Sequence, residues 1–254
     1  MDVTKFSMKG KVALVIGGAG DIGKAIAETL SIAGADVVIS SRKQENLDAA
    51  AEEIKAKSGG KVVGMASHIG KLDQAKGLVE NIVKDFGRID VLVNSSGSSF
   101  MVPLADVEEW QWDAVMNVNL KGPFFLAQQI APVMKKQGGG SIINITSYMG
   151  VRVEETLGVY CISKAAVIHM TKAMAKEWGK DNIRVNAIAP AWVHSRLADP
   201  FLKLPGVNDR MLSQTSIGRF GDPDDVAAIA LYLASDAAVN TTAGIFPLDY
   251  GMLT

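Results

Sequence analysis

Cysteine and histidine, the residues most often used for disulfides and transition-metal sites, are scarce in this chain of 254 residues. Cys161 is the only cysteine, so the chain can form neither an internal disulfide nor a multi-cysteine metal site. The three histidines, His68, His169 and His194, lie far apart and lack the spacing of metal ligands. We therefore expect no metal in this protein, and a packed core position for the Cys161 thiol.

An excess of charge of either sign and long apolar runs are also missing. The 26 Lys and Arg residues nearly balance the 27 Asp and Glu residues, which gives a formal net charge of −1. Because the basic residues are also dispersed, we expect no nucleic-acid partner. No apolar run reaches the roughly 18–20 residues of a membrane span, and residues 1–11 lack the apolar core of a signal peptide. We expect a cytoplasmic protein with no membrane partner.

Short apolar runs alternate with helical periodicity along the whole chain. The apolar runs predict strands at residues 11–16, 36–40, 61–66, 89–93, 141–145, 183–188 and 244–248. Helices are predicted between them at residues 24–30, 47–57, 72–86, 107–137 (interrupted at Gly122 and Pro123), 160–179 and 224–234. Strict alternation predicts an α/β fold, a doubly wound parallel sheet with helices on both faces. Since no linker divides the chain, we expect a single domain over residues 1–254.

Glycines cluster directly after the first predicted strand, in Gly17-Gly18-Ala19-Gly20-Asp21-Ile22-Gly23. Glycine lets the backbone approach a pyrophosphate closely, and the N-terminal N–H groups of the following helix attract the anion. Alone, a glycine-rich turn is a weak signal, because a tight turn without a ligand has the same sequence. Its position inside a β-α-β unit predicts that Gly17, Gly20, Ile22 and Gly23 bind a dinucleotide.

The ribose of such a dinucleotide is read at the end of the second strand, about 20 residues past the glycines. This position holds Ser41, Arg42 and Lys43 and no acid. A carboxylate would favour a free 2′-hydroxyl, whereas a hydroxyl beside a guanidinium favours a 2′-phosphate, because arginine makes charge-assisted bidentate hydrogen bonds. We therefore predict NADP(H) rather than NAD(H), with Ser41 and Arg42 in the site. The alternative is that Arg42 and Lys43 are a solvated surface pair.

A tyrosine, a lysine and a serine form a second constellation. Tyr160 and Lys164 are one turn apart on a predicted helix, so the ammonium group can lie beside the phenol. A tyrosine phenol has a pKa of about 10. Because a neighbouring cation favours the ionised form, we predict a lowered pKa for Tyr160. A tyrosine and a lysine at this spacing, with no other motif in the chain, usually lie together on the protein surface. Ser147, directly after the fifth strand, and the glycine-rich turn favour an acid–base role instead.

From about Lys9 to Gly251, the sequence resembles the short-chain dehydrogenase/reductase family. The matching stretches occur in the order of the family's motifs: Gly17 to Gly23, Asn94 to Gly97, Asn117 to Gly122, Ile142 to Ser147, Tyr160 to Lys164, Ile183 to Asn186 and Gly218 to Ala227. Together these motifs are highly specific. The resemblance implies a Rossmann-type sheet, reversible hydride transfer between a nicotinamide and a carbonyl or secondary alcohol, and a homotetramer.

The resemblance also implies a role for each motif residue. Tyr160 would be the general acid/base, Lys164 would lower its pKa and bind the nicotinamide ribose, and Ser147 would hold the substrate oxygen. Asn119 would support a water-linked proton path through Lys164, and Ser195 would bond the carboxamide. Besides Tyr160 and Lys164, the residues expected around the cofactor are His68, Ile69, Asn94, Gly97, Pro190, Val193 and Ser195.

Some residues depart from the family's pattern. Ile16 stands where a threonine is usual, and Ala191 where a glycine is usual. Asp21 replaces the second fingerprint glycine and places a carboxylate where the pyrophosphate is expected. Asp21 could point outward and favour the helix N-terminus, or Gly20 could provide the close approach. The alternative function is a non-catalytic nucleotide-binding scaffold with the same fold, and Asp21 is the strongest support for it.

Residues 190–216 lack clear periodicity, and a loop of that length in a compact domain is usually a lid or a binding segment. We predict that this segment is a substrate-binding lid. Its large apolar side chains suggest an apolar wall: Trp192, Leu197, Phe201, Leu202, Leu204, Met211 and Leu212. Arg152, His194 and Arg196 could instead bind a carboxylate or phosphate. Sugar acids, 3-oxoacyl groups, steroids and simple ketones all stay open as substrates.

Overall fold

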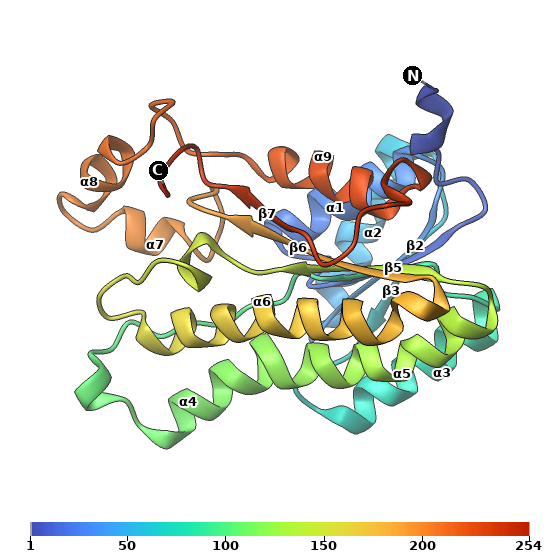
Figure 1. The fold of residues 1–254 in the computed structure, drawn as a ribbon, viewed down its shortest axis with the longest axis horizontal. Helices are drawn as coiled ribbons and strands as arrows, with labels where there is room; N and C mark the ends of the chain where they lie inside the picture. The colour runs from blue at the N-terminus through green and yellow to red at the C-terminus, as the bar shows by residue number, and fades with distance from the viewer. Residues whose placement is uncertain (1, 254) are drawn as a thin grey trace.

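The computed structural model describes residues 2–253 and places seven strands in one parallel sheet (Figure 1). The strand order is β3-β2-β1-β4-β5-β6-β7, and each of these neighbouring pairs is parallel. The strands are β1 (Val12–Ile16), β2 (Asp36–Ser41), β3 (Val62–Ala66), β4 (Val91–Asn94), β5 (Gly140–Ile145), β6 (Ile183–Pro190) and β7 (Ile245–Leu248). The predicted doubly wound parallel sheet is confirmed.

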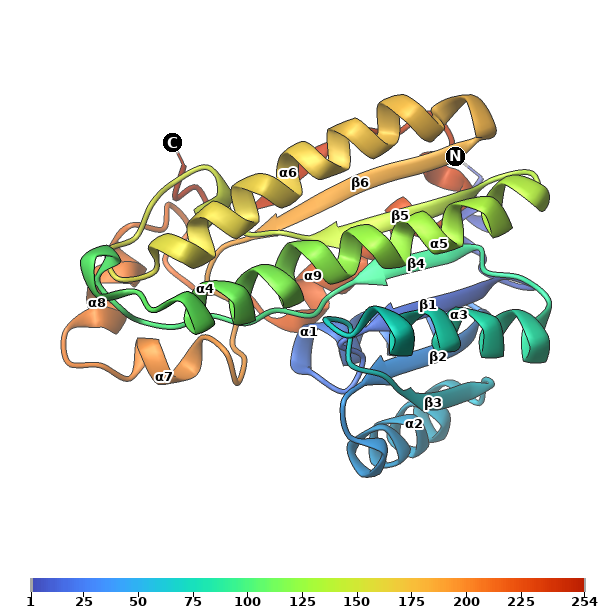
Figure 2. The same ribbon diagram turned by 90° about the horizontal axis from the view of Figure 1, so that it is seen from below.

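Helices cover both faces of this sheet (Figures 1 and 2). One face carries α1 (Asp21–Ile32), α2 (Gln44–Ser58) and α9 (Pro223–Ala234). The other face carries α3 (Leu72–Phe86), α5 (Gly122–Lys136) and α6 (Gly158–Trp178). Short 3₁₀ turns complete the chain at η1 (Val3–Phe6), η2 (Leu104–Asp106), η4 (Tyr148–Gly150), η5 (Gly179–Asp181) and η6 (Asp236–Ala238).

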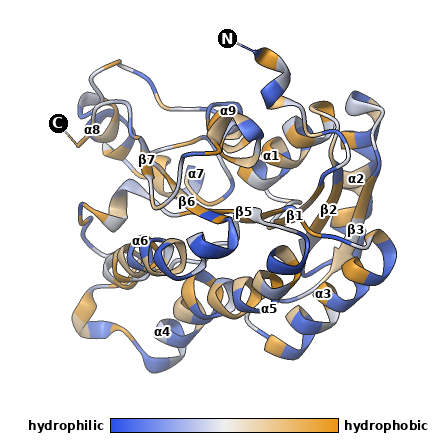
Figure 3. Cartoon of the chain, turned by 45° about the vertical axis from the view of Figure 1, so that its right-hand side comes forward, coloured by the Kyte–Doolittle hydropathy of each residue, from blue (hydrophilic) through white to orange (hydrophobic). Residues whose placement is uncertain are grey.

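Strand β1 shows why the sheet strands have continuous rather than alternating apolar sequences. Ala13 and Val15 belong to the core on the α1 side, whereas Val12, Leu14 and Ile16 belong to the core on the α3 side. Successive side chains point to opposite faces, so both faces need apolar residues when helices cover both. Figure 3 shows the same arrangement, with hydrophobic strands between helices whose outer surfaces carry hydrophilic residues.

The long helical segment after β4 differs from the prediction. The interruption expected at Gly122 and Pro123 is wrong, because α4 (Glu109–Met116) continues through a π-helical turn (Asn117–Lys121) into α5. A Cβ at Gly122 would lie 2.5 Å from the carbonyl oxygen of Ile69, so this glycine permits a close approach rather than a break. Proline lacks the N–H of a regular α ladder, and a π turn accommodates that local irregularity.

The carboxyl ends of the central strands meet at one edge of the sheet. Ile16 of β1 is in register with Ser40 of β2 and Asn94 of β4, and Asn94 with Asn144 of β5. The strand order reverses between β1 and β4, and in doubly wound sheets ligands bind in the crevice at such a switch point. The segment after β6 lies at this same edge (Figure 2).

Residues 190–216 are more ordered in secondary structure than the sequence predicted. Two short helices, α7 (Asp199–Leu202) and α8 (Val207–Ser213), interrupt the expected loop. Helices of one or two turns are too short to show a periodic apolar pattern, which explains why they were not predicted. No helix among residues 2–253 is both long enough and apolar enough to cross a membrane.

Candidate active site

Two adjoining cavities lie at the carboxyl edge of the sheet, one of about 610 Å³ and one of about 470 Å³. The larger cavity is lined by the glycine-rich turn and the ends of β2 and β3, and we call it the cofactor cavity. The smaller one is lined by α6, the end of β5 and the lid, and we call it the substrate cavity. The residues that line both are Ile22, Ser95, Ser96, Gly97, Ser195, Arg196 and Leu197.

The glycine-rich turn has the geometry predicted for a phosphate-binding loop. Gly17 has a φ of +79°, and a Cβ there would lie 2.8 Å from the carbonyl oxygen of Ser95. A Cβ at Gly23 would lie 2.3 Å from the carbonyl oxygen of Gly17, so only glycine lets α1 start this close to the turn. Gly20 precedes the first helical residue, Asp21. The four predicted residues Gly17, Gly20, Ile22 and Gly23 all line the cofactor cavity.

Asp21 faces the lid. Its Oδ2 accepts hydrogen bonds from the Arg196 backbone N–H at 2.9 Å and from Arg196 Nε at 3.4 Å. Arg196 Nη2 donates to the carbonyl oxygen of Ala19 at 2.7 Å. The sequence suggested Arg196 as a binder of substrate anions, and it offered no sign of this contact across 175 positions.

The far end of the cofactor cavity is basic. Ser41, Arg42 and Lys43 line it, and neither cation takes part in an ion pair within residues 2–253. His68 and Ile69, which are expected near the cofactor, also line this cavity. His68 Nδ1 accepts the Gly70 N–H at 3.1 Å, so a neutral imidazole carries its proton on Nε2.

The cofactor cavity fits a dinucleotide by an observation independent of the motif. The hydroxyl oxygens of Ser67 and Ser96 are buried and have no hydrogen-bond partner among the described residues. Both serines line the cavity. Buried polar atoms are nearly always hydrogen-bonded, so these hydroxyls indicate a polar ligand. Residues 2–253 contain no group of three His, Cys, Asp or Glu side chains placed to hold a metal ion.

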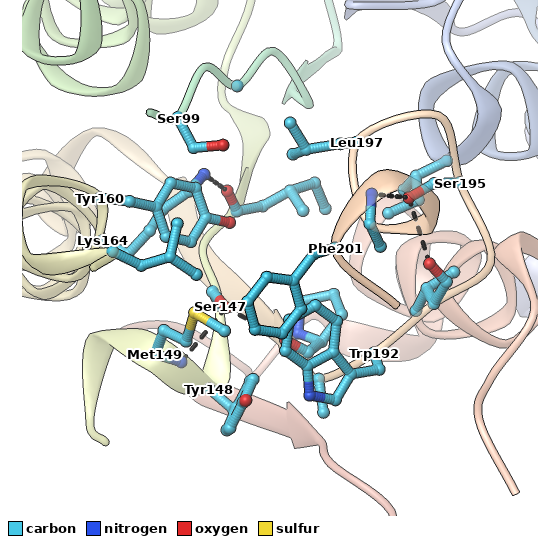
Figure 4. Close-up of a pocket in the computed structure, with 18 of the residues that line it drawn as sticks. Ser99, Ser147, Tyr148, Met149, Tyr160, Lys164, Trp192, Ser195, Leu197 and Phe201 are labelled. Carbon is cyan, nitrogen blue, oxygen red and sulfur yellow. Dashed lines mark hydrogen bonds between the residues drawn. The ribbon is translucent and has the colours of Figure 1, made fainter. Parts of the chain in front are cut away.

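Ser147, Tyr160 and Lys164 all line the substrate cavity (Figure 4). Lys164 Nζ donates to the carbonyl oxygen of Ile145 at 2.9 Å and lies 5.5 Å from the centre of the Tyr160 ring. Ser147 Oγ accepts the Met149 N–H at 3.2 Å. The three side chains come from the end of β5 and one turn of α6, so the predicted constellation is brought together.

Burial controls the pKa values of this constellation. Desolvation raises the pKa of Tyr160 to about 12, and its hydrogen bond with Ser147 acts in the opposite direction without overcoming it. Desolvation lowers the pKa of Lys164 to about 8. The predicted lowering of the Tyr160 pKa by Lys164 is therefore wrong for the protein alone. At neutral pH the phenol is a neutral proton donor, and Lys164 still carries most of its charge.

Asn119 and Asn94 lie beneath the cavities and line neither of them. Asn119, in the π-helical turn, bonds the backbone of Ser98 through both amide atoms and donates to Ser163 Oγ at 2.9 Å. Asn94 Nδ2 donates to Asn144 Oδ1 at 2.8 Å, across β4 and β5. Both side chains thus hold elements together under the site, and Asn94 Oδ1 is buried without a hydrogen-bond partner among residues 2–253. The roles expected of Asn119 in a proton path and of Asn94 toward the cofactor stay predictions.

The lid contributes both predicted and unpredicted contacts. Of the three lid residues expected around the cofactor, Ser195 lines both cavities, whereas Pro190 and Val193 line the substrate cavity and not the cofactor cavity. The Ser195 hydroxyl bonds locally, donating to the Val193 carbonyl oxygen at 3.1 Å and accepting the Ala198 N–H at 3.2 Å. Trp192 stacks on Phe201 with ring centres 4.9 Å apart and an interplanar angle of 1°. Cys161 is buried in the same apolar cluster, as predicted.

The wall of the substrate cavity is mainly apolar. Its large apolar side chains are Phe100, Met101, Tyr148, Met149, Leu157, Trp192, Leu197 and Phe201. Of the suggested anion binders, Arg152 donates to the Met252 carbonyl oxygen and His194 lies 3.9 Å from Asp199, and neither lines the cavity. Only Arg196 does, and it is paired with Asp21.

The sequence of the whole chain has many relatives. Residues 17–253 match the family model described as enoyl-(acyl carrier protein) reductase. The chain is 40% identical to the 3-oxoacyl-[acyl-carrier-protein] reductase FabG of Thermotoga maritima, over 97% of this chain and 99% of that protein.

Two solved structures of dehydrogenases are similar to this chain over nearly its whole length. A 7α-hydroxysteroid dehydrogenase complexed with NADH and 7-oxo glycochenodeoxycholic acid is 32% identical, with a TM-score of 0.95 over 99% of this chain and 97% of that one. A gluconate 5-dehydrogenase from Burkholderia cenocepacia in complex with NADP and tartrate is 30% identical, with a TM-score of 0.95 over 100% of this chain and 99% of that one. With its sheet, glycine-rich turn and Ser147/Tyr160/Lys164 group, this chain belongs to the short-chain dehydrogenase/reductase family of oxidoreductases.

Proposed function

We propose that this protein reduces a ketone to a secondary alcohol, or catalyses the reverse oxidation, with NADP(H) and with Tyr160 as the general acid/base. The observation that carries this proposal is the convergence of Ser147, Tyr160 and Lys164 on the substrate cavity. Gly97 connects that cavity to the cofactor cavity, and Lys164 Nζ lies 4.0 Å from the position of a Cβ on Gly97. A ketone beside Tyr160 is thus also beside the cofactor cavity.

When bound, the nicotinamide supplies or accepts the hydride at the substrate carbon. The chain's own residues act on the oxygen. Ser147 donates a hydrogen bond that orients the carbonyl, and Tyr160 transfers its phenolic proton to the oxygen as negative charge develops there. Lys164, charged below a pKa of about 8, stabilises the resulting phenolate. A Tyr160 pKa of about 12 favours this neutral donor form, which suits reduction.

Two cations that have no ion pair among the described residues support NADP(H) as the cofactor. Arg42 and Lys43 are exposed at the end of β2, where the ribose of a dinucleotide lies in this fold, and the adjacent Ser41 adds a hydroxyl. A ribose 2′-phosphate would receive charge-assisted hydrogen bonds from Arg42. The related structures hold NADH in one case and NADP in another, so the family leaves the choice to such local residues.

The lining of the substrate cavity supports an uncharged ketone with a bulky apolar body. Trp192 and Phe201 form one wall, and Met101 and Leu157 contribute further apolar surface. A free carboxylate or phosphate would need a cation, and the hydrogen bonds of Arg196 to Asp21 and to the Ala19 carbonyl oxygen direct its guanidinium toward the glycine-rich turn of the cofactor cavity. Sugar acids and phosphorylated substrates are therefore disfavoured within the range that the sequence left open.

The test is to mix the protein with NADPH and a panel of ketones, and to compare it with Tyr160→Phe. Loss of the proton donor should lower kcat by about 10²–10⁴-fold while the NADPH dissociation constant stays within about twofold. Tyr148→Phe is the matched control, because Tyr148 lines the same cavity but lies off the catalytic helix. NADPH binding without turnover of any ketone by the unmodified protein would instead favour the non-catalytic scaffold.

Three further expectations stay predictions. The homotetramer rests on the family resemblance, and the cytoplasmic location rests on composition. The single domain with residues 190–216 as a substrate-binding lid is also a proposal, which the contribution of Trp192 and Phe201 to the substrate cavity supports. Size-exclusion chromatography with light scattering measures the number of subunits directly.

A further inference from the structure

The contact between Asp21 and Arg196 joins two parts of the site that no other ion pair within residues 2–253 connects. Asp21 is the first residue of α1, and Arg196 belongs to the lid. Asp21 Oδ2 accepts both the backbone N–H and the Nε–H of Arg196, while Arg196 Nη2 holds the Ala19 carbonyl oxygen. These three hydrogen bonds, which we call the clasp, fix the backbone and the side chain of Arg196 together.

The clasp places a cation directly over the glycine-rich turn. Arg196 Nη2 lies 3.9 Å from the position of a Cβ on Gly20. The Arg196 side chain is 69% exposed and lines the cofactor cavity. Arg196 Nη1 makes no hydrogen bond to any of residues 2–253, so donors remain for a further acceptor.

The same geometry resolves the charge conflict created by Asp21. The N-terminal N–H groups of α1 and the glycine-rich turn form an anion site, in which an isolated carboxylate would repel a pyrophosphate. The other charged or titratable groups around the cavity, Arg42, Lys43 and His68, lie at the ends of β2 and β3. Arg196 is the cation that meets Asp21, so it offsets this carboxylate locally.

We propose that Asp21 is a positioning residue that holds Arg196 over the glycine-rich turn, and that Arg196 thereby becomes a binding group for the cofactor's pyrophosphate. This inference rests on the proposed nucleotide-dependent function. An aspartate at a position that usually requires glycine is then part of the cofactor site. The lid, through Arg196, takes part in binding the cofactor as well as the substrate.

A double-mutant cycle on NADPH binding tests the positioning role. Arg196→Ala should weaken NADPH binding about tenfold in the parent protein, as expected for the loss of a charge-assisted hydrogen bond. In the Asp21→Gly background, two of the three hydrogen bonds that hold Arg196 are lost and only the one to the Ala19 carbonyl oxygen remains, so the same substitution should weaken binding by less than about twofold. If Arg196→Ala weakens NADPH binding by the same factor in the parent protein and in Asp21→Gly, the proposal is overturned. This holds whether Asp21→Gly alone strengthens or weakens NADPH binding.

Hydrogen exchange in the cofactor-free protein provides a second readout that needs no turnover. The Arg196 N–H should exchange about tenfold faster in Asp21→Gly, because its acceptor is lost. Asp73→Asn is the matched control, since Asp73 is also an exposed acid in the first turn of a helix, α3, away from both cavities. Unchanged exchange in Asp21→Gly would show that the clasp does not hold the lid, which overturns the inference.

The two measurements separate this inference from the proposed function. Failure of the unmodified protein to bind either NADPH or NADH would overturn the proposed function and the role of Arg196 toward pyrophosphate. Normal binding and ketone reduction with multiplicative fold-changes would leave the proposed function intact and overturn only the positioning role of Asp21. Coupled fold-changes together with faster exchange at Arg196 would support both.

Discussion

The cofactor cavity and the substrate cavity adjoin, yet they are built from different material. The cofactor cavity is shaped by backbone: the turn at Gly17, the approach of α1 at Gly23, and the ends of β1 and β2. The substrate cavity is shaped by side chains, above all the stacked rings of Trp192 and Phe201 in the lid. Backbone geometry tolerates only glycine at such points, whereas an apolar wall can change its residues without changing the fold. The comparison teaches that a fixed cofactor site and an adaptable substrate site can share one edge of a sheet.

The largest effect on cofactor binding should come from disturbing the backbone of the cofactor cavity. In Gly23→Ala the new Cβ would lie 2.3 Å from the Gly17 carbonyl oxygen, so the turn or the helix must move. Overpacking of this kind costs about 1–3 kcal/mol, and the same loss in binding free energy corresponds to roughly 5- to 150-fold weaker NADPH binding. Fluorescence titration measures the affinity.

Gly77→Ala is the matched control for that substitution. Gly77 lies within α3, and a Cβ there meets no atom within 4 Å. Because alanine is favoured over glycine in a helix, Gly77→Ala should raise the free energy of unfolding by about 0.5–1 kcal/mol and leave NADPH binding unchanged. Equal NADPH affinity in the two variants would break the distinction between a backbone-built cavity and the rest of the fold.

Arg42→Ala should have the next largest effect and should act on one cofactor only. Arg42 is exposed, so we expect about tenfold weaker NADPH binding rather than the larger loss of a buried charge pair. NADH binding should stay within about twofold, which makes it the internal control. An unchanged preference between NADPH and NADH would show that Arg42 and Lys43 are the solvated pair considered from the sequence.

Phe201→Ala tests the side-chain wall of the other cavity. The substitution removes the ring that stacks on Trp192, and kcat/KM for an apolar ketone should fall about tenfold. The NADPH dissociation constant should not change, because Phe201 does not line the cofactor cavity. Phe124→Ala, at an exposed position on α5, is the control. A similar fall in NADPH affinity would contradict the separation of the two cavities.

The smallest effect concerns pH. Lys164 has a lowered pKa of about 8 in the folded protein, so it loses its charge as pH rises through that value. Reduction should then slow by about threefold between roughly pH 7.5 and 8.5, because neutral Lys164 no longer stabilises the Tyr160 phenolate. The profile of kcat/KM for NADPH reports this free-enzyme pKa. Lys164→Arg, which stays charged, should abolish the fall in that range, and a fall that persists would assign it to another group.

The sequence predicted those features that depend on local chain geometry. The continuous apolar run of β1 predicted a strand buried on both faces, because strand side chains alternate between faces. The four-residue spacing of Tyr160 and Lys164 predicted a shared helix face, because a helix turn contains 3.6 residues. Ser41 and Arg42 line the cofactor cavity, as expected for residues at the carboxyl end of the predicted second strand.

Long-range proximity and burial, in contrast, were decided by the tertiary structure. The clasp between Asp21 and Arg196 joins residues 175 positions apart, and no local pattern specifies such a contact. The pKa of Tyr160 rises because packing removes water from the phenol, an effect that outweighs the attraction expected from spacing alone. Local periodicity depends only on residues that are close in the sequence. Desolvation and distant ion pairs form only when the folded sheet brings the carboxyl ends of its strands next to the lid.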